Sequence, residues 1–135
     1  MPRTSDVIEV SVLAEESLLG AILIVSSYGD KTAISETRRI IQPEHFSDFG
    51  MYIPIRARIY KAMLDCDVAP HIVNLANYLK KINRLTKNDI SNMWRYISLD
   101  ICSLDYLTYA KVLRECAFEL KPNLKQATMT RGIPL

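Results

Sequence analysis

Apolar residues recur along this chain at intervals of three and four positions, and strict alternation of apolar and polar residues is absent. Intervals of this kind place apolar side chains on one face of an α-helix. The clearest stripe comprises Ile72, Leu75, Ala76, Leu79 and Ile82. A similar stripe near the N-terminus comprises Ala14, Leu18, Ala21, Ile22 and Val25. The pattern therefore predicts an all-α protein.

Prolines and short polar side chains mark the predicted helix ends. Pro54 and Pro70 are tolerated in a first helical turn, whereas Pro122 ends the helix before it. The helices are expected to begin after Ser11, near Thr32, near Tyr52 or Ile53, at Pro70, near Thr86 and near Ser103. The sixth continues to Leu120. We predict a compact bundle of about six helices over 11–120, a flexible segment over 1–10, and a linker or tail over 121–135.

The last two predicted helices are separated by only a short reversal, so we expect a C-terminal antiparallel helical hairpin used for dimerisation. Apolar residues cover more of its surface than one buried stripe requires, which indicates that a second chain covers it. Trp94 either fills the core or anchors a partner, because tryptophan is favoured in interface hot spots. The predicted interface comprises Met93, Trp94, Ile97, Leu104, Leu107, Tyr109 and Leu113.

Composition narrows the class of protein further. A chain of 135 residues is one domain's worth and can bury a core without disulfides or metals. Its longest apolar run falls well short of the roughly 20 residues needed to span a bilayer, and no secretory leader pattern opens the chain. We therefore expect a cytoplasmic protein. Cys66, Cys102 and Cys116 lack metal or disulfide spacing and are interpreted as small structural residues.

Chemistry-bearing motifs are missing from the sequence. Four glycines leave no GxxxxGK[ST] phosphate loop, so nucleotide hydrolysis by this chain is not expected. His45 and His71 stand alone and are predicted to be structural. Glu15 and Glu16 are interpreted as favourable charges near the N-terminus of the first helix. We predict no catalytic, metal or cofactor site, and no enzyme activity for this chain.

Basic residues support a competing prediction, a small nucleic-acid-binding helical protein whose affinity falls steeply with salt. The residues in question are Arg38, Arg39, Arg56, Arg58, Lys61, Lys80, Lys81 and Arg84. The simpler interpretation of Lys80, Lys81 and Arg84 is a solvated helix end, where positive charge suits the helix dipole. The net charge of +2 does not separate these possibilities.

Four segments in order resemble the N-terminal domain of the DnaB-type bacterial replicative DNA helicases, across about residues 11–120. The first is Glu15-Glu16-Ser17-Leu18-Leu19-Gly20. The second is Phe46 followed by Ile59, Tyr60 and Met63. The third is Pro70, Ile72, Val73, Leu75, Ala76 and Leu79. The fourth is Tyr109-Ala110, Val112-Leu113-Arg114-Glu115 and Ala117. One departure is His71, where the family often has an acidic residue.

The resemblance implies a helical bundle with a protruding hairpin that pairs between subunits. Three such dimers build the collar of a hexamer, and the collar contacts primase and influences helicase loading. We therefore expect a homo-oligomer, a dimer or a hexamer built as a trimer of dimers, with primase and loader as partners and DNA contacted only indirectly. The ATP-hydrolysing motor is absent from these 135 residues. A stand-alone regulator that inserts into a helicase collar is a further alternative.

Overall fold

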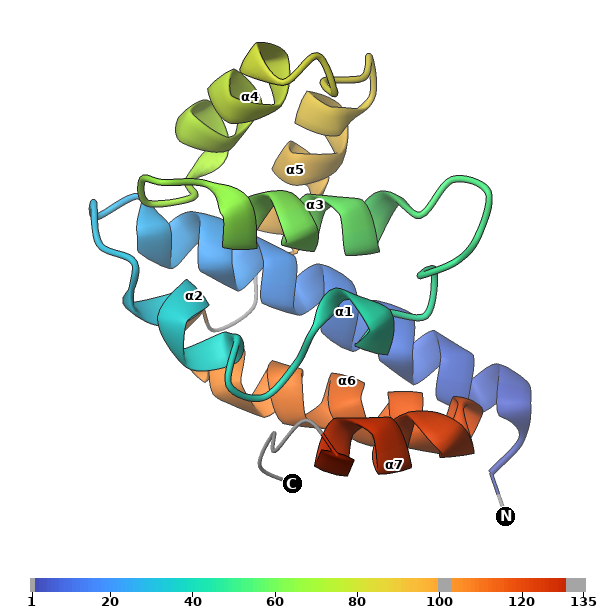
Figure 1. The fold of residues 1–135 in the computed structure, drawn as a ribbon. Helices are drawn as coiled ribbons and strands as arrows, with labels where there is room; N and C mark the ends of the chain where they lie inside the picture. The colour runs from blue at the N-terminus through green and yellow to red at the C-terminus, as the bar shows by residue number, and fades with distance from the viewer. Residues whose placement is uncertain (1, 100–102, 131–135) are drawn as a thin grey trace.

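The computed structural model describes residues 2–99 and 103–130, and the described chain is helical, without a strand. Figure 1 shows the arrangement of its helices. The α-helices are α1 (Thr4–Ser26), α2 (Thr32–Thr37), α3 (Ile55–Asp65), α4 (Ile72–Lys81), α5 (Asp89–Ile97), α6 (Tyr106–Leu120) and α7 (Pro122–Thr130). Two 3₁₀ turns, η1 (Pro43–His45) and η2 (Ser103–Asp105), complete the described elements. The all-α prediction is confirmed.

Helix α1 is the centre of the bundle. It runs the length of the molecule, with α6 and α7 below it and α3, α4 and α5 above it in Figure 1. Its middle is fully buried, including Leu18, Leu19 and Ile22. Fully burying one such side chain stabilises a fold by about 1.5–3 kcal/mol. The helix therefore supplies core residues to the packing on both sides of it.

A buried carboxylate ties α1 to the loop before α3. Glu15 is completely buried and accepts hydrogen bonds from the Ser11 hydroxyl at 2.6 Å and the Arg56 Nε at 2.9 Å. The backbone N–H and hydroxyl of Ser47 each donate to the same carboxylate at 3.1 Å. A buried charge is tolerated only when it is paired and hydrogen-bonded in this way. The expected dipole role of Glu15 is thus wrong, because α1 begins eleven positions earlier.

The same loop also sets the start of α3. The carboxylate of Asp48 accepts from the backbone N–H of Arg56 at 2.7 Å and of Ala57 at 3.0 Å, which satisfies donors of the first helical turn. Burial alone would lower the pKa of Arg56, but its bond to Glu15 and its nearness to Glu15 and Asp48 raise that pKa overall. Arg56 therefore remains charged between two carboxylates.

At the N-terminal ends of α4 and α5, side chains accept hydrogen bonds from backbone N–H groups. His71 is the N-cap of α4, and its Nδ1 accepts from the Asn74 backbone N–H at 3.3 Å. An acidic side chain can accept the same bond, so His71 fills a structural position as the N-cap of α4. At α5, Asp89 accepts from the Thr86 N–H at 2.7 Å and pairs with Arg58 of α3.

Both ends of the described chain differ from the prediction. Helix α1 begins at Thr4, within the expected flexible segment over 1–10, and Asp6 in its first turn pairs with Arg3 at 3.2 Å. In the expected linker over 121–135, Pro122 ends α6 and opens α7. A proline fits this place because the first residue of a helix needs no N–H donor.

Helix α7 folds back towards η1 through a buried histidine. The Nδ1 of His45 accepts from the Gln42 backbone N–H at 2.8 Å, so the proton of a neutral ring lies on Nε2. That Nε2 lies 3.0 Å from the Thr128 hydroxyl, which itself donates to the Leu124 carbonyl at 2.8 Å. His45 is therefore structural, as predicted.

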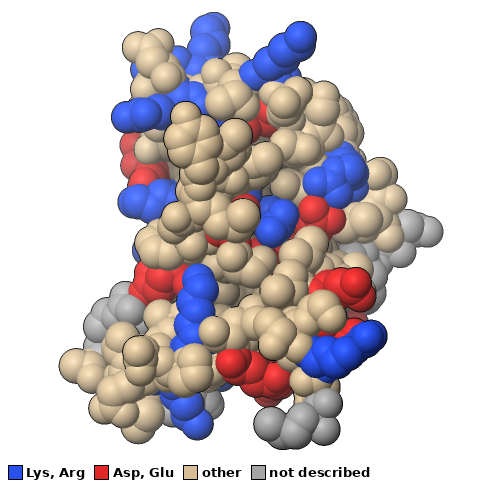
Figure 2. Space-filling model, turned by 90° about the vertical axis from the view of Figure 1, so that its right-hand side faces the viewer, with Lys and Arg blue, Asp and Glu red and all other residues tan. Residues whose placement is uncertain are grey.

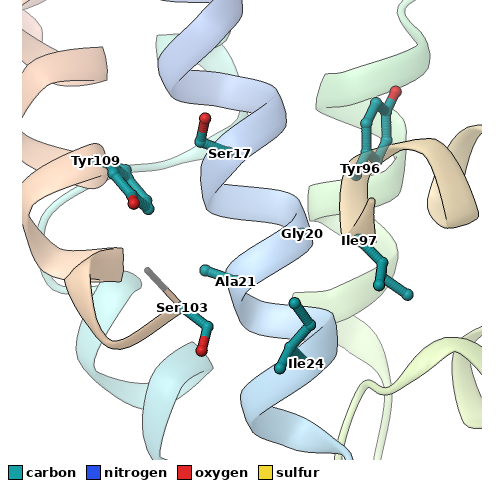
Figure 3. Close-up of a pocket in the computed structure, with 8 residues that line it drawn as sticks. All are labelled: Ser17, Gly20, Ala21, Ile24, Tyr96, Ile97, Ser103 and Tyr109. Carbon is teal, nitrogen blue, oxygen red and sulfur yellow. The ribbon is translucent and has the colours of Figure 1, made fainter. Parts of the chain in front are cut away.

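The two helices predicted to form a hairpin, one from near Thr86 and one from near Ser103 to Leu120, correspond to α5 and α6. Both α5 and α6 pack mainly against α1 rather than against each other. Figure 3 shows α1 passing between Tyr96 of α5 and Tyr109 of α6. Small residues on both interfaces, Gly20 on one side and Ala110 and Ala117 on the other, let α1 come between them. The short reversal that suggested a hairpin lies partly outside the described residues.

We expect Glu15→Gln to lower the free energy of unfolding by about 3 kcal/mol, because the variant leaves Arg56 facing an uncharged amide in a buried site. Urea unfolding followed by circular dichroism measures the loss. Glu9→Gln, at an exposed position of the same helix, is the control and should change stability by about 0.5 kcal/mol or less. A loss for Glu15→Gln no larger than the control's would contradict the role of this carboxylate.

Alkaline pH should loosen the contact between α2 and α6. The Tyr106 hydroxyl donates to Glu36 at 2.5 Å, and this bond, with some burial, raises the pKa of Tyr106 to about 12 from the ordinary 10.0. The bond is therefore fully present below pH 10 and is lost as the pH rises towards 12. The midpoint temperature of thermal unfolding should fall less steeply between pH 10 and pH 12 for Tyr106→Phe than for the unaltered protein. Equal slopes would show that the bond does not contribute.

Candidate protein interface

The close approach of α5 to α1 depends on Gly20. A Cβ added at this position would lie 2.7 Å from the carbonyl carbon of Tyr96 and closer still to its oxygen, nearer than real Cβ atoms come to backbone. It would also lie 3.3 Å from the backbone nitrogen of Ile97. Figure 3 shows Gly20 on the side of α1 that faces these two residues. Gly20 therefore allows the close packing of α5 on α1.

An ion pair at the surface reinforces the same crossing. Both terminal nitrogens of Arg95 donate to the carboxylate of Glu16 at 2.9 Å, and this bond raises the pKa of Arg95 despite some burial. Burial and, secondarily, the Glu16 charge raise the pKa of the neighbouring Tyr96 to about 12. Two-pronged pairs of this kind fix orientation as well as adding energy. Glu16 thus orients α5 on α1 and is not a dipole-stabilising residue of a first turn.

Two apolar grooves lie beside α1, one on the side of α6 and one on the side of α5. On the α6 side a groove of about 200 Å³ is lined by Val10, Leu13, Ala14, Ser17, Tyr109 and Val112. On the α5 side a groove of about 360 Å³ is lined by residues that include Ile24, Val73, Trp94 and Ile97. A narrow cleft at Gly20 shares Ser17 and Tyr109 with the first groove and Ile24 and Ile97 with the second (Figure 3). We call the two grooves and the cleft together the α1 face.

Large apolar side chains are exposed on the α1 face. Leu13 is 62% exposed and Trp94 is 57% exposed, and Val10 and Val73 are also exposed. The α6-side groove is lined almost entirely by apolar surface. Single exposed apolar residues are ordinary, but contiguous apolar surface of this kind marks interaction sites. The α1 face is therefore the candidate interface of this domain.

The structure separates the seven residues of the predicted interface into three groups. Met93 and Leu113 are fully buried in the core, so their side chains are not exposed to a partner. Trp94 and Leu104 are exposed, Leu104 by 77%. Ile97, Leu107 and Tyr109 are partly buried, and Ile97 and Tyr109 line the α1 face. The alternative that Trp94 fills the core is therefore excluded.

Three contributors from α1 itself were missed in the sequence. Val10, Leu13 and Ile24 line the α1 face, yet residue 10 was assigned to a flexible segment and the others to no site. The signal was present as a second stripe, with Val10, Leu13, Ser17, Gly20 and Ile24 separated by three or four positions. A helix with apolar residues on two faces contacts neighbours on both.

Other candidate chemistry is accounted for by the fold. Cys66 and Cys116 are free and buried, and burial together with nearby glutamates raises the pKa of the Cys116 thiol. Cys102 lies outside the described residues. Within the part of the chain that the structure describes, no cluster of three His, Cys, Asp or Glu residues is placed to hold a metal ion. None of the helices over these residues is long and apolar enough to cross a bilayer.

Three of the eight basic residues considered for nucleic-acid binding are bound to groups within the fold. Arg56 is bound to buried Glu15, and Arg58 is bound to buried Asp89. Arg38 donates to the Leu64 carbonyl at 3.1 Å. These arginines are thus held by structural partners, and the fold gives them roles that do not involve phosphate.

The fold and its surface define a class of protein: an all-α domain built around one long helix, α1. Apolar grooves lie beside this helix, and the buried carboxylate of Glu15 binds the loop before α3. Comparison with known proteins makes the assignment more specific. The sequence model of the family described as "DnaB-like helicase N terminal domain" matches residues 8–115, which is most of the chain. This chain belongs to the DnaB-like helicase N-terminal domain family.

A solved structure agrees with this assignment at the level of the fold. The crystal structure of the N-terminal domain of DnaB helicase from Mycobacterium tuberculosis superimposes with a TM-score of 0.67 at 24% sequence identity. The match covers 87% of this chain and 80% of that one. No curated protein matches the sequence. The region matched is the non-catalytic N-terminal domain of a replicative helicase, and these 135 residues contain no motor domain.

We expect Gly20→Ala to destabilise the domain by about 2 kcal/mol, because the added methyl group forces α5 away from α1. In an unobstructed helix the same substitution would stabilise by about 1 kcal/mol, so the sign of the effect is diagnostic. Urea unfolding gives the magnitude, with Glu9→Ala, exposed on the same helix, as the control for helix propensity. A stabilised Gly20→Ala variant would contradict the crossing geometry.

Proposed function

We propose that this domain is an assembly and docking module that self-associates through the α1 face. The observation that carries the proposal is the exposure of Leu13 and Trp94 in the two apolar grooves beside α1. Burying such side chains against a partner removes apolar surface from water, which is the main driving force for association. Aromatic anchors beside apolar pockets are typical of interface hot spots.

A second copy of the chain is the occupant that the family assignment supports. Replicative helicases act as oligomers, and the α1 face offers both a projecting indole ring at Trp94 and apolar grooves that could receive it. An isologous dimer would place each Trp94 against the partner copy's α1 face, which uses one surface twice. We propose a dimer as the basic unit, with a hexamer formed as a trimer of dimers.

The assembled domain would then contact other replication proteins. The family resemblance supports primase and the helicase loader as partners, in the cytoplasm, with DNA engaged only indirectly. The ion pairs of Arg56 and Arg58 agree with an indirect role, since those charges stabilise the fold. In this proposal the domain performs no chemistry and organises the proteins that do.

Light scattering on a concentration series tests self-association. The unaltered protein should form dimers at high micromolar concentration, and Leu13→Glu with Trp94→Glu should keep it monomeric, because a carboxylate on the α1 face must be desolvated on pairing. Gln126→Glu with Met129→Glu, both at exposed positions of α7, adds the same two negative charges elsewhere and should leave the dimer intact. A strict monomer for the unaltered chain, or dimers for the double variant, would contradict the proposal.

A further inference from the structure

A second surface lies apart from the α1 face, between α3 and α4. It is a groove of about 250 Å³ whose lining includes Lys61, Ala62, Tyr78, Leu79, Ile82 and Arg84. No residue that lines it also lines the α1 face. We call it the α3–α4 groove. The proposed self-association does not use it.

The floor of the α3–α4 groove is apolar. Ala62 and Leu79 are buried beneath it, Tyr78 is partly buried, and Ile82 is 45% exposed at the C-terminal end of α4. Its lining is mainly apolar in area, and of its charged residues three are cationic and one, Asp65, is anionic. A groove of this kind binds a ligand that brings its own apolar surface. It fits an amphipathic element better than a sugar-phosphate backbone.

The surroundings of the groove are strongly basic. Segments 58–65 and 78–89 contain six Lys and Arg residues and two Asp residues, a net charge of +4 in a chain whose total is +2. The rest of the molecule therefore carries a net negative charge. Figure 2 shows Lys and Arg side chains gathered at the top of the molecule, the end formed by α4 and α5 in Figure 1. The charge of this domain is thus polarised towards one end.

Among the residues that the structure describes, most of these cations have no carboxylate partner. Arg58 is neutralised by buried Asp89, and Lys61 pairs with Asp65 at 2.9 Å in an exposed, weak bridge. For Lys80, Lys81, Arg84 and Lys87, all exposed, the described residues include no carboxylate within ion-pair distance. A solvated helix end explains Lys80 and Lys81, since cations suit the C-terminus of α4. It does not explain Arg84 and Lys87, which lie beyond that helix.

We propose that the α3–α4 groove binds an acidic amphipathic helix of a protein partner. The apolar face of that helix would cover Tyr78 and Ile82, while its flanking carboxylates would meet Lys61 on one side and Lys81 and Arg84 on the other. Helix-in-groove recognition works in this way, with apolar anchors for affinity and complementary charge for specificity and rate of association. This surface extends the docking role to a partner class, and it would stand even if the domain were monomeric.

Nucleic acid is the main competing ligand for a basic surface, and the groove disfavours it. Single-stranded nucleic acid binds where bases stack on aromatic side chains along a basic channel, whereas Tyr78 is the one aromatic residue that lines this groove. Phosphates of a duplex would gain nothing from the apolar floor. An acidic helix uses both the floor and the rim, which favours a protein partner.

The test is a nuclear magnetic resonance titration of the ¹⁵N-labelled chain with a synthetic helical peptide. The peptide carries leucines at i, i+3, i+4 and i+7 with glutamates on both flanks, and a second peptide has lysine in place of every glutamate. The acidic peptide should shift amides of 58–65 and 78–85, and the basic peptide should not bind. Single-stranded and duplex oligonucleotides, titrated at the same salt concentration, complete the set of probes.

Variants separate charge from apolar contact. Lys81→Glu with Arg84→Glu should weaken binding of the acidic peptide at least about tenfold, and Ile82→Ser should weaken it without changing the charge. Arg39→Glu with Lys125→Glu makes the same charge change at exposed positions elsewhere and should leave binding unchanged. Failure of the acidic peptide to bind, equal losses in the control variant, or tighter binding of an oligonucleotide would overturn the proposal. The oligomeric state of each sample, measured separately, tests self-association independently.

Discussion

The buried carboxylate of Glu15 fixes the position of α3 and of the loop before it on α1. A charge inside a protein must be matched by donors and cations, so the loop that carries Ser47 and the first turn of α3 that carries Arg56 have to close over α1. Asp48, next to Ser47, then caps α3. The ion pair from Arg58 to Asp89 extends this order from α3 to α5. A series of polar contacts that starts at Glu15 thus links α1, α3 and α5.

The opposite side of α1 depends on close packing rather than on buried charge. Gly20 lets the backbone of α5 touch α1, and the small residues of α6 pack closely on its other flank, so α1 lies between two close neighbours. What remains open is the apolar α1 face. The segment Glu15 to Gly20 therefore serves both sides within six residues: Glu15 locks the inner loop, Glu16 orients α5, and Gly20 sets the crossing.

The sequence predicted the all-α class, five of the six helix starts to within three residues, and the family. These depend on local signals, since apolar periodicity and proline placement act within a few residues. The role of Glu15 could not be predicted, because its partners Ser47 and Arg56 are distant in the chain. The start of α1 was missed because Ser11 resembles an N-cap, whereas its hydroxyl bonds Glu15 inside the helix. Met93 and Leu113 were placed at the interface because periodicity alone cannot say which of two apolar stripes faces inward.

The central claim is that a second copy covers the α1 face, and Trp94 reports on it directly. It is the single tryptophan of the chain and is more than half exposed in the monomer. Fluorescence emission and sedimentation should be measured on the same samples, from about 1 to 300 µM, where weak dimers form. The account predicts that the emission of Trp94 shifts to shorter wavelength over the concentrations at which the mass doubles. A doubling of mass with unchanged emission would contradict it, because the contact would then lie on another surface.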